Sequence, residues 1–422
     1  MIDLKELRED PEKFRQAVQH KNEQVDFDAV LRLDEQRRDL LNTVNEMKHH
    51  RNVVSEEIGQ KKKAGEDASE QIAAMREVAE DIRAIDSQIA ELEAELHTLL
   101  LWIPNVPHES VPVGPDETAN EVVREWGEIP DSGFAPRNHL ELGESLNLFD
   151  FARAAKVSGS GFPLYTGLGA KLERALIDFM IDYHVREHGY TEVLPPLLVS
   201  RDAMENTGQL PKLEEDMYNT EKDDLFLIPT GEVPVTNIHS AEILPEDKLP
   251  LRYVAYTPCF RREAGSHGRE TRGFLRVHQF NKVEMVEIVR PESSYQVLET
   301  LAGQAEAILQ ALELPYRVLN LSTGDLSFAA AKCYDLELWA PGEEQWLEVS
   351  SCSNFEDFQA RRANIRFRRK STRNVEHVHT LNGSGVATAR LLVALLETHQ
   401  REDGTVKLPE VLKPYLGTTI LE

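Results

Sequence analysis

"FRREAGSHGRETRGFLRVHQF" runs from Phe260 to Phe280 and gathers five arginines in a chain whose formal net charge is −26. Three glycines interrupt the stretch and apolar residues close both ends, so it predicts two strands joined by a long basic loop. Two interpretations stay open on these residues alone: a solvated hairpin tip, or a clamp for a small polyanion. Arginine suits the second because its guanidinium matches phosphate oxygens as a planar fork. The arginines are Arg261, Arg262, Arg269, Arg272 and Arg276.

The composition of the 422 residues is that of a globular protein with room for two or three domains. No apolar run approaches the roughly 20 residues of a membrane span, and the start "MIDLKELREDPEKF" lacks an apolar signal core. Three scattered cysteines, Cys259, Cys333 and Cys352, form no CxxC pair and predict core thiols in a reducing cytoplasm. The acidity argues against nonspecific coating of nucleic acid, but allows a local basic surface that contacts one RNA.

Residues 27–103 carry the repeat of a coiled coil. Seam residues recur at alternating steps of three and four in two runs, separated by "QKKKAGEDASE" with Gly65 and a capping candidate, Ser69. We expect two long helices folded back as an antiparallel hairpin. The first run is Val30, Leu33, Arg37, Leu40, Val44, Met47, Arg51, Val54 and Ile58, and the second is Met75, Val78, Ile82, Ile85, Ile89, Leu92, Leu96, Leu99 and Ile103.

Charge is uneven along this hairpin. Between Lys48 and Lys63, five basic residues face two glutamates, whereas the second helix is acidic. The basic segment is either an ordinary solvated surface or a surface that meets RNA phosphates. Arg37 and Arg51 interrupt the seam, where they either fix the register or let the helices splay. The basic residues are Lys48, Arg51, Lys61, Lys62 and Lys63.

A proline-rich segment, "IPNVPHESVPVGPDE" (103–117), follows the hairpin, so we divide the chain into residues 1–105 and 106–422. The second part alternates helical stretches with β-rich runs, which suits an antiparallel sheet with helices packed on it. Neither GxGxxG nor GxxxxGK[ST] occurs, so the common phosphate loops are absent from the sequence. The β-rich runs are "LFLIPT", "RYVAYTPCFR", "VEMVEIV", "YRVLNLS", "CYDLELWAP" and "QWLEVSSCS".

Three segments in order resemble the motifs of class II aminoacyl-tRNA synthetases. Residues 171–200 combine an amphipathic helix, ended by Gly189, with an extended strand that carries Pro195 and Pro196; they resemble motif 1, which implies a dimer interface at Pro196. Phe260 to Glu263 begin a stretch that resembles motif 2, and "LNGSGVATARLLVALLE" (381–397) resembles motif 3. The resemblance implies an α+β fold, an antiparallel β-sheet core flanked by helices, with an N-terminal coiled-coil arm.

The resemblance narrows to the bacterial seryl-tRNA synthetases and covers essentially the whole chain. Besides the arm and the motif 2 stretch (257–286), it rests on "PTGEVPVTN" (229–237), "VSSCSNFEDFQARR" (349–362) and "HTLNGSG" (379–385). Gly231 stands where the family more usually has alanine or serine. The implied activity is that of a cytoplasmic serine–tRNA ligase. It activates L-serine with ATP and transfers it to tRNA(Ser), and also to tRNA(Sec) where the host has one.

The resemblance also implies roles for the nucleotide residues. Arg261 would bridge the α-phosphate and the serine carboxylate, Glu263 would contact the adenine amino group, and Phe280 and Arg390 would stack on the two faces of the adenine. Arg261, Glu263 and Arg390 are the implied catalytic set. Glu348 and Ser351 would hold Mg²⁺, which prefers oxygen ligands. The implied ATP set is Arg261, Arg262, Glu263, Arg276, Val277, Phe280, Glu348, Val349, Ser350, Ser351 and Arg390.

Serine selection requires polar partners for a hydroxyl and an ammonium group. Buried acceptors penalise alanine strongly, because alanine leaves them unpaired. The alternative for Glu284 is a structural salt bridge to Lys282 or to an arginine. The implied serine set is Thr230, Gly231, Glu232, Arg261, Glu284, Asn382 and Ser384. In the family the arm reaches the tRNA on the other subunit, so we expect a homodimer with tRNA bound across subunits and no membrane partner.

Other functions share some of these features. A scaffold that has lost activity would keep the coiled coil, but would not need Arg261, Glu263, Glu284, Glu348 and Arg390. A paralogue that loads a carrier protein should lack a full arm. Synthetases for threonine or proline share the core motifs, but usually add a C-terminal anticodon-binding domain, and little sequence follows residue 397 here.

Overall fold

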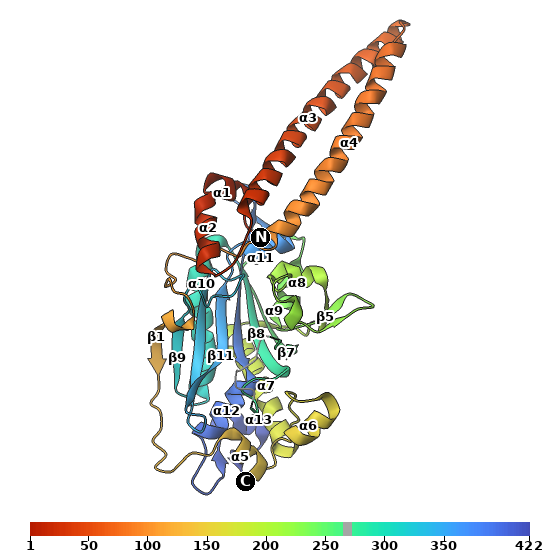
Figure 1. Ribbon diagram of the computed structural model, residues 1–422. Helices are drawn as coiled ribbons and strands as arrows, with labels where there is room; N and C mark the ends of the chain where they lie inside the picture. Colours follow the sequence, from red (N-terminus) through yellow and green to blue (C-terminus); the bar gives the residue numbers. More distant parts are fainter. Residues whose placement is uncertain (265–271) are drawn as a thin grey trace. The chain divides into compact units, whose positions relative to one another are not determined.

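The computed structural model describes residues 1–264 and 272–422, and its contacts divide the chain into two compact units (Figure 1). One unit comprises Ile2–Val18 and Glu23–Ile103, and the other comprises Met1, Gln19–Asn22 and Pro104–Glu422. Gly265, Gly268 and Arg269 of the basic stretch lie outside the described residues.

The first unit is built around the predicted helical hairpin. Two short helices, α1 (Leu4–Glu9) and α2 (Pro11–His20), precede the long helices α3 (Phe27–Ala64) and α4 (Ser69–Leu100), which we call the arm. Gly65 ends α3 at a φ of 78°, a left-handed conformation that glycine adopts without strain. Ser69 is not the predicted capping residue: it is the first helical residue, and the Asp67 carboxylate accepts its backbone N–H at 2.9 Å.

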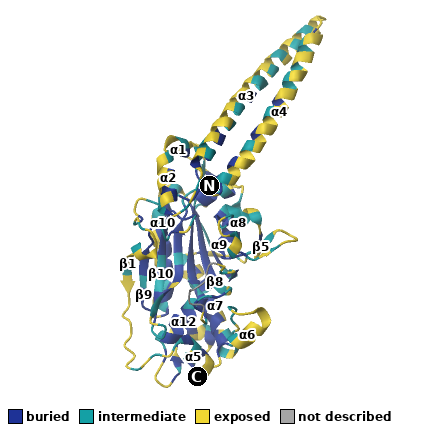
Figure 2. Ribbon diagram, in the orientation of Figure 1, coloured by how far each residue is buried: buried dark blue, intermediate teal, exposed yellow. Residues whose placement is uncertain are grey.

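The predicted seam is confirmed. Every predicted seam position is buried or half-buried, and Figure 2 shows exposed residues along the rest of the arm. Val44, Ile82 and Ile89 are the most buried members of the apolar cluster between the helices. Arg37 pairs across the arm with Glu93 at 2.8 Å, which favours the register-fixing interpretation at that position.

The second unit is organised by an eight-stranded sheet, which confirms the predicted antiparallel core. Neighbouring strands are antiparallel, except that β2 is parallel to β7. Five of the predicted β-rich runs coincide with strands of this sheet, and "LFLIPT" contains β5 of a smaller one. The order across the large sheet is β1 (Glu121–Trp126), β9 (Tyr316–Asn320), β10 (Lys332–Ala340), β11 (Gln345–Asn354), β14 (His379–Ala387), β8 (Gln279–Val289), β7 (Leu251–Phe260) and β2 (Thr191–Glu192).

Three helices supply most of the apolar surface that covers the sheet: α7 (Gly167–His188), α10 (Ser294–Ala311) and α12 (Thr388–Thr398). Buried residues such as Leu176, Leu301 and Leu392 join side chains of β8, β10 and β14 in one core cluster. All three cysteines are buried free thiols, as expected.

The predicted continuous strand after α7 is wrong. β2 ends at Glu192 and β3 begins at Leu198, so Pro195 and Pro196 lie in the irregular segment between two short strands. Proline has no N–H to contribute to a strand ladder, which accounts for the break.

Smaller elements complete the unit, and no described helix is both long enough and apolar enough to cross a membrane. The remaining helices are α5 (His139–Ser145), α6 (Phe151–Ser158), α8 (Arg201–Thr207), α9 (Glu232–Thr236), α11 (Phe358–Ala363) and α13 (Lys413–Leu416). The remaining strands are β3 (Leu198–Ser200), β4 (Asn219–Thr220), β5 (Leu225–Leu227), β6 (Ile243–Pro245), β12 (Arg366–Arg368), β13 (Val375–His377), β15 (Val406–Lys407) and β16 (Ile420–Leu421). Single 3₁₀ turns span Glu117–Ala119, Glu214–Asp216, Asn237–His239, Glu246–Lys248, Pro291–Ser293 and Glu410–Leu412.

Candidate active site

Strand β8 lies between β7 and β14, and its alternating side chains form the floor of two cavities. In the antiparallel register, Glu284 lies opposite Ala255 of β7 and Ser384 of β14. Side chains two residues apart point to the same face of a strand. Phe280, Lys282 and Glu284 therefore share one face, and each lines at least one of the two cavities.

The first cavity, of about 480 Å³, gathers nearly all of the predicted serine residues. Thr230 Oγ1 donates a hydrogen bond to Glu284 Oε2 at 2.9 Å, and the backbone N–H of Glu232 donates to Thr230 Oγ1 at 3.3 Å. The predicted residues that line this cavity are Thr230, Glu232, Arg261, Glu284, Asn382 and Ser384.

Lys282 is a cavity residue that the sequence analysis did not assign. Its Nζ lies 2.5 Å from Glu284 Oε2 and donates to Thr230 Oγ1 at 2.8 Å. The salt bridge that was the alternative for Glu284 is therefore present, and Glu284 nevertheless lines the cavity. The available signal was the two-residue spacing, which places Lys282 on the face of β8 that carries Glu284.

Glu232 is the most strongly perturbed carboxyl of the first cavity. Burial, reinforced by the negative charge of Glu284, raises the pKa of Glu232 to about 7. Gln359 Nε2 donates to Glu232 Oε1 at 2.6 Å, and Thr380 Oγ1 donates to Gln359 Oε1 at 2.7 Å, which fixes the orientation of the amide. A cationic ligand group beside Glu232 would offset the cost of its buried charge.

Gly231 is the predicted serine residue that does not line the cavity. A Cβ built there would lie 3.0 Å from Glu284 Cβ and 3.1 Å from Thr257 Oγ1. A side chain at this position would press on Glu284, so the glycine leaves Glu284 more room than the usual alanine or serine would.

The second cavity, of about 260 Å³, adjoins the first and is lined by three arginines. Arg390, in the first turn of α12, donates from Nε to the carbonyl of Leu275 at 3.0 Å and from a terminal nitrogen to the carbonyl of Glu348 at 3.1 Å. The Arg261 guanidinium lies 5.1 Å from the centroid of the Phe280 ring. The predicted ATP residues that line this cavity are Arg261, Glu263, Arg276, Val277, Phe280, Glu348, Val349, Ser350, Ser351 and Arg390.

The structure does not place two of the predicted nucleotide residues, Arg262 and Glu263, as their predicted roles require. Arg262 lines neither cavity, and its backbone N–H donates to the carbonyl of Asp216 at 2.8 Å. Glu263 forms an ion pair with Arg276, so its carboxylate is already engaged. Both roles remain predictions.

Glu348 and Ser351 line both cavities, at the boundary between them. A carboxylate and a hydroxyl are hard oxygen donors of the kind that magnesium binds. Glu348 is half-exposed, and its carboxylate oxygen is 3.5 Å from the Arg390 guanidinium. The pair fits magnesium on these grounds, with the remaining ligands to be supplied by phosphate or water.

A loop over the first cavity depends on a residue that the sequence analysis missed. Lys21 Nζ donates to the carbonyls of Ser327 at 2.9 Å, Phe328 at 3.2 Å and Ala330 at 2.6 Å. Ser327 and Phe328 line the first cavity. The contact joins segments about 300 residues apart, so no local sequence pattern predicts it.

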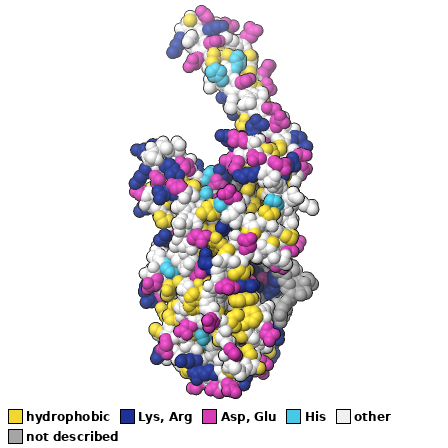
Figure 3. Space-filling view, turned by 90° about the vertical axis from the view of Figure 1, so that its left-hand side faces the viewer, with side chains coloured by type: hydrophobic (Ala, Val, Ile, Leu, Met, Phe, Trp, Pro, Cys, Tyr) yellow, Lys and Arg dark blue, Asp and Glu magenta, His cyan; other side chains and the backbone are white. Residues whose placement is uncertain are grey.

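The residues predicted for tRNA and for the dimer lie outside both cavities. Lys48 pairs across the arm with Asp86 at 2.9 Å, and Lys61, Lys62 and Lys63 occupy the last turn of α3. Figure 3 shows lysines and arginines interspersed with acidic side chains on the displayed surface of the arm. Arg51 is half-buried at the seam, and Pro196 lies in the irregular segment after β2.

Two family models match the chain. Residues 1–107 match the seryl-tRNA synthetase N-terminal domain, and residues 212–399 match the tRNA synthetase class II core domain (G, H, P, S and T).

Curated relatives and a solved structure agree with these matches. The chain is 54% identical over 417 residues to the serine–tRNA ligase of Carboxydothermus hydrogenoformans, covering 99% of this chain and 98% of the relative. It is 54% identical over 418 residues to that of Bacillus subtilis, with the same two coverages. The crystal structure of seryl-tRNA synthetase from Pyrococcus horikoshii complexed with ATP has a TM-score of 0.91 at 41% identity, covering 100% of this chain and 99% of that chain. Because the likeness includes the N-terminal domain as well as the core, this chain belongs to the seryl-tRNA synthetases, within the class II aminoacyl-tRNA synthetases.

Proposed function

We propose that the two adjoining cavities of this serine–tRNA ligase bind the amino acid and the nucleotide. The observation that carries this proposal is the pairing of the cavities on one sheet. The first holds carboxylates, a hydroxyl and an amide suited to a small polar amino acid, and the second is lined by arginines suited to phosphates. Membership of the family supports the same substrates.

In the first step, a carboxylate oxygen of serine attacks the α-phosphorus of ATP, and the bond to the leaving pyrophosphate breaks. The nucleophile is already ionised at neutral pH, so the step needs alignment and charge stabilisation but no general base. Arg261 lines both cavities, which suits a guanidinium that holds the serine carboxylate and the α-phosphate together. Arg276 and Arg390, with Phe280 in the same cavity, would bind the other parts of the nucleotide.

Magnesium, held by Glu348 and Ser351, would add positive charge on the phosphates. The position of these two residues at the boundary between the cavities supports this assignment.

Serine would be selected by the polar floor of the first cavity. The carboxylate of Glu232 suits the ammonium group of the amino acid, whereas Thr230, Glu284 and Ser384 surround the space for the hydroxyl. Alanine would leave these buried groups unpaired.

In the second step, the 3′-hydroxyl of the terminal tRNA adenosine attacks the carbonyl carbon of the adenylate, and AMP leaves. We propose that residues 1–105 form the tRNA-binding domain and residues 106–422 the catalytic domain, in a cytoplasmic homodimer that contacts through the region of Pro196. The arm would hold tRNA(Ser) on the partner subunit through shape and backbone contacts, and tRNA(Sec) where it exists.

Pyrophosphate exchange across the twenty amino acids tests the activation step. Exchange should require ATP and serine, and kcat/KM for alanine should be at least about a hundredfold lower, because alanine leaves buried polar groups unpaired. Charging of tRNA(Ser) with labelled serine tests the complete reaction. Comparable exchange with alanine or glycine would contradict the proposal.

The raised pKa of Glu232 predicts how serine binding depends on pH. Only the ionised carboxylate pairs with the serine ammonium, so KM for serine should rise about tenfold for each pH unit below about 7, and level off above it. In Glu232→Gln, KM should be high and independent of pH between about 5.5 and 8. A flat profile in the unmodified enzyme would remove Glu232 from the ammonium site.

Deleting the arm separates activation from tRNA charging. Residues 30–100 are replaced by a short flexible linker; the arm belongs to its own compact unit, so the catalytic unit should still fold. Serine-dependent exchange should change by less than about threefold, whereas charging of tRNA(Ser) should fall at least about a hundredfold, because the lost surface holds the tRNA.

Reversing Lys61, Lys62 and Lys63 to glutamate is the matched charge test. It should weaken tRNA binding and flatten its salt dependence, while exchange stays unchanged. An arm-deleted enzyme that charges tRNA(Ser) as well as the intact enzyme would show that the arm is a spacer.

A further inference from the structure

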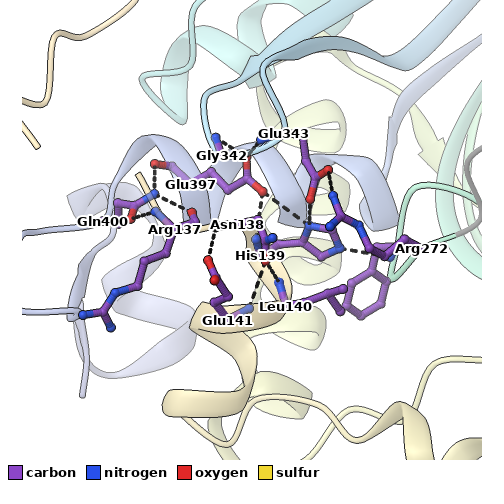
Figure 4. A network of polar contacts seen from close by, with 11 residues as sticks. Arg137, Asn138, His139, Leu140, Glu141, Arg272, Gly342, Glu343, Glu397 and Gln400 are labelled. Carbon is purple, nitrogen blue, oxygen red and sulfur yellow. Dashed lines mark hydrogen bonds and ion pairs between the residues drawn. The ribbon is translucent and has the colours of Figure 1, made fainter. Parts of the chain in front are cut away.

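A buried polar network lies at the end of the basic loop, outside both cavities. It joins His139, the first residue of α5, to Glu397 near the end of α12 and to Glu343 in the turn between β10 and β11 (Figure 4). The side chains of all three are at most 1% exposed. The position of these residues indicates no role in substrate binding. Burying carboxylates costs free energy, so we expect them to stabilise the fold or the site.

The contacts of His139 indicate which ring nitrogen accepts a hydrogen bond and which donates one. The backbone N–H of Phe274 donates to His139 Nε2 at 3.3 Å, so Nε2 acts as an acceptor. The ring proton is then on Nδ1, which lies 3.3 Å from Glu397 Oε1 and 3.1 Å from Glu343 Oε1. The imidazole therefore links the Phe274 N–H to Glu397, while Glu343 Oε1 lies near Nδ1 without a hydrogen bond in the described structure.

The carboxylates are themselves held in place. Glu397 accepts three backbone N–H groups, those of His139 at 2.8 Å, Gly342 at 2.8 Å and Glu343 at 3.2 Å. Glu343 Oε2 pairs with the Arg272 guanidinium at 2.5 Å. Glu397 is therefore fixed and can orient His139 through their hydrogen bond, whereas Glu343 is held through Oε2 and its Oε1 forms no hydrogen bond with the described residues.

A histidine and two glutamates are also the composition of a metal site, and their ligand atoms all lie within 4.8 Å of one another. Here Glu343 is ion-paired with Arg272, and Glu397 accepts hydrogen bonds from three backbone N–H groups. Arg272 supplies a positive charge of the kind that a metal ion would bring, and the contacts that the network makes with the basic loop indicate its role.

The network holds the returning end of the basic loop. Gly273 packs directly on the imidazole: a Cβ there would lie 2.1 Å from His139 Nε2, so only glycine allows this approach. Its neighbour Phe274 is clamped by the hydrogen bond to Nε2, and Leu275 by the hydrogen bond from Arg390. Phe274, Leu275 and the next two residues, Arg276 and Val277, form one wall of the second cavity.

Helix α12 thus fixes this wall at two residues, Leu275 and Phe274. Arg390 binds Leu275 directly, and Glu397 acts on Phe274 through His139. Seven residues separate Arg390 from Glu397, which is about two helical turns, so both side chains lie on the same side of α12.

We propose that His139 is a positioning residue for the nucleotide: oriented by Glu397, it fixes the Phe274 backbone and thereby the wall of the second cavity. This inference rests on the proposal that the second cavity binds ATP. Loss of the contact should leave the serine floor intact, because the floor residues lie on β8, β14 and the segment around Thr230. The expected signature is therefore a weaker interaction with ATP and an unchanged one with serine.

Two substitutions of His139 separate its acceptor from its donor. Asparagine places an amide near the Nδ1 position and leaves the Phe274 N–H without an acceptor, whereas glutamine places an oxygen near the Nε2 position. In serine-dependent exchange, His139→Asn should raise KM for ATP about tenfold, because the cavity wall shifts. His139→Gln should stay within about threefold of the unmodified enzyme, and KM for serine should change less than about twofold in both variants.

His399→Asn is the matched control. His399 follows Glu397 by two residues and its Nε2 contacts the Leu312 carbonyl at 3.0 Å, away from the loop. This substitution can lower the melting temperature, but should leave KM for ATP unchanged.

The outcomes are distinct. An unchanged KM for ATP in His139→Asn, or an equal rise in both KM values, would overturn the proposal. If His139→Asn does not fold, Glu397→Gln, which keeps the side-chain shape, must raise KM for ATP. Calorimetric titration of the same variants with ATP gives a second readout: if the unmodified enzyme binds ATP but shows no serine-dependent exchange, the proposed function fails while the role of His139 is still measured.

Discussion

The pairing register of β8 between β7 and β14 is the constraint on which the candidate site depends. It sets Glu284 opposite Ser384, and the two-residue period then places Lys282 and Phe280 on the same face. A slip of one residue would turn all three side chains to the other side of the sheet. The two cavities adjoin because one strand contributes to the floor of both.

Electrostatics explains how this site exists in an acidic chain. Burial, together with the negative charge of the nearby Glu284, raises the pKa of Glu232. Lys282 offsets part of this repulsion through its ion pair with Glu284. Arg261 and Arg276 line both cavities and Arg390 lines the second, so positive charge is concentrated where the phosphates of the proposed nucleotide would lie.

Much of the fold could be predicted because periodic patterns are local. The seam steps gave the arm, and the β-rich runs gave the sheet. Within the site, Glu284 and Arg390 were found only through the resemblance, and their individual roles stay proposals. Lys282 could have been found from its spacing to Glu284 on β8, but Lys21 and His139 could not, because their partners lie more than 100 residues away in the sequence and leave no local pattern.

The central claim is that one continuous site on this sheet binds an amino acid and a nucleotide together. A stable seryl-adenylate analogue, in which a sulfamoyl group replaces the phosphate, tests it most directly by calorimetric titration. We expect one analogue per chain, bound far more tightly than ATP or serine alone because it fills both cavities, and at least about a hundredfold more tightly than the alanyl counterpart. Equal affinity for the seryl and alanyl analogues, or affinity no greater than that for ATP, would contradict it.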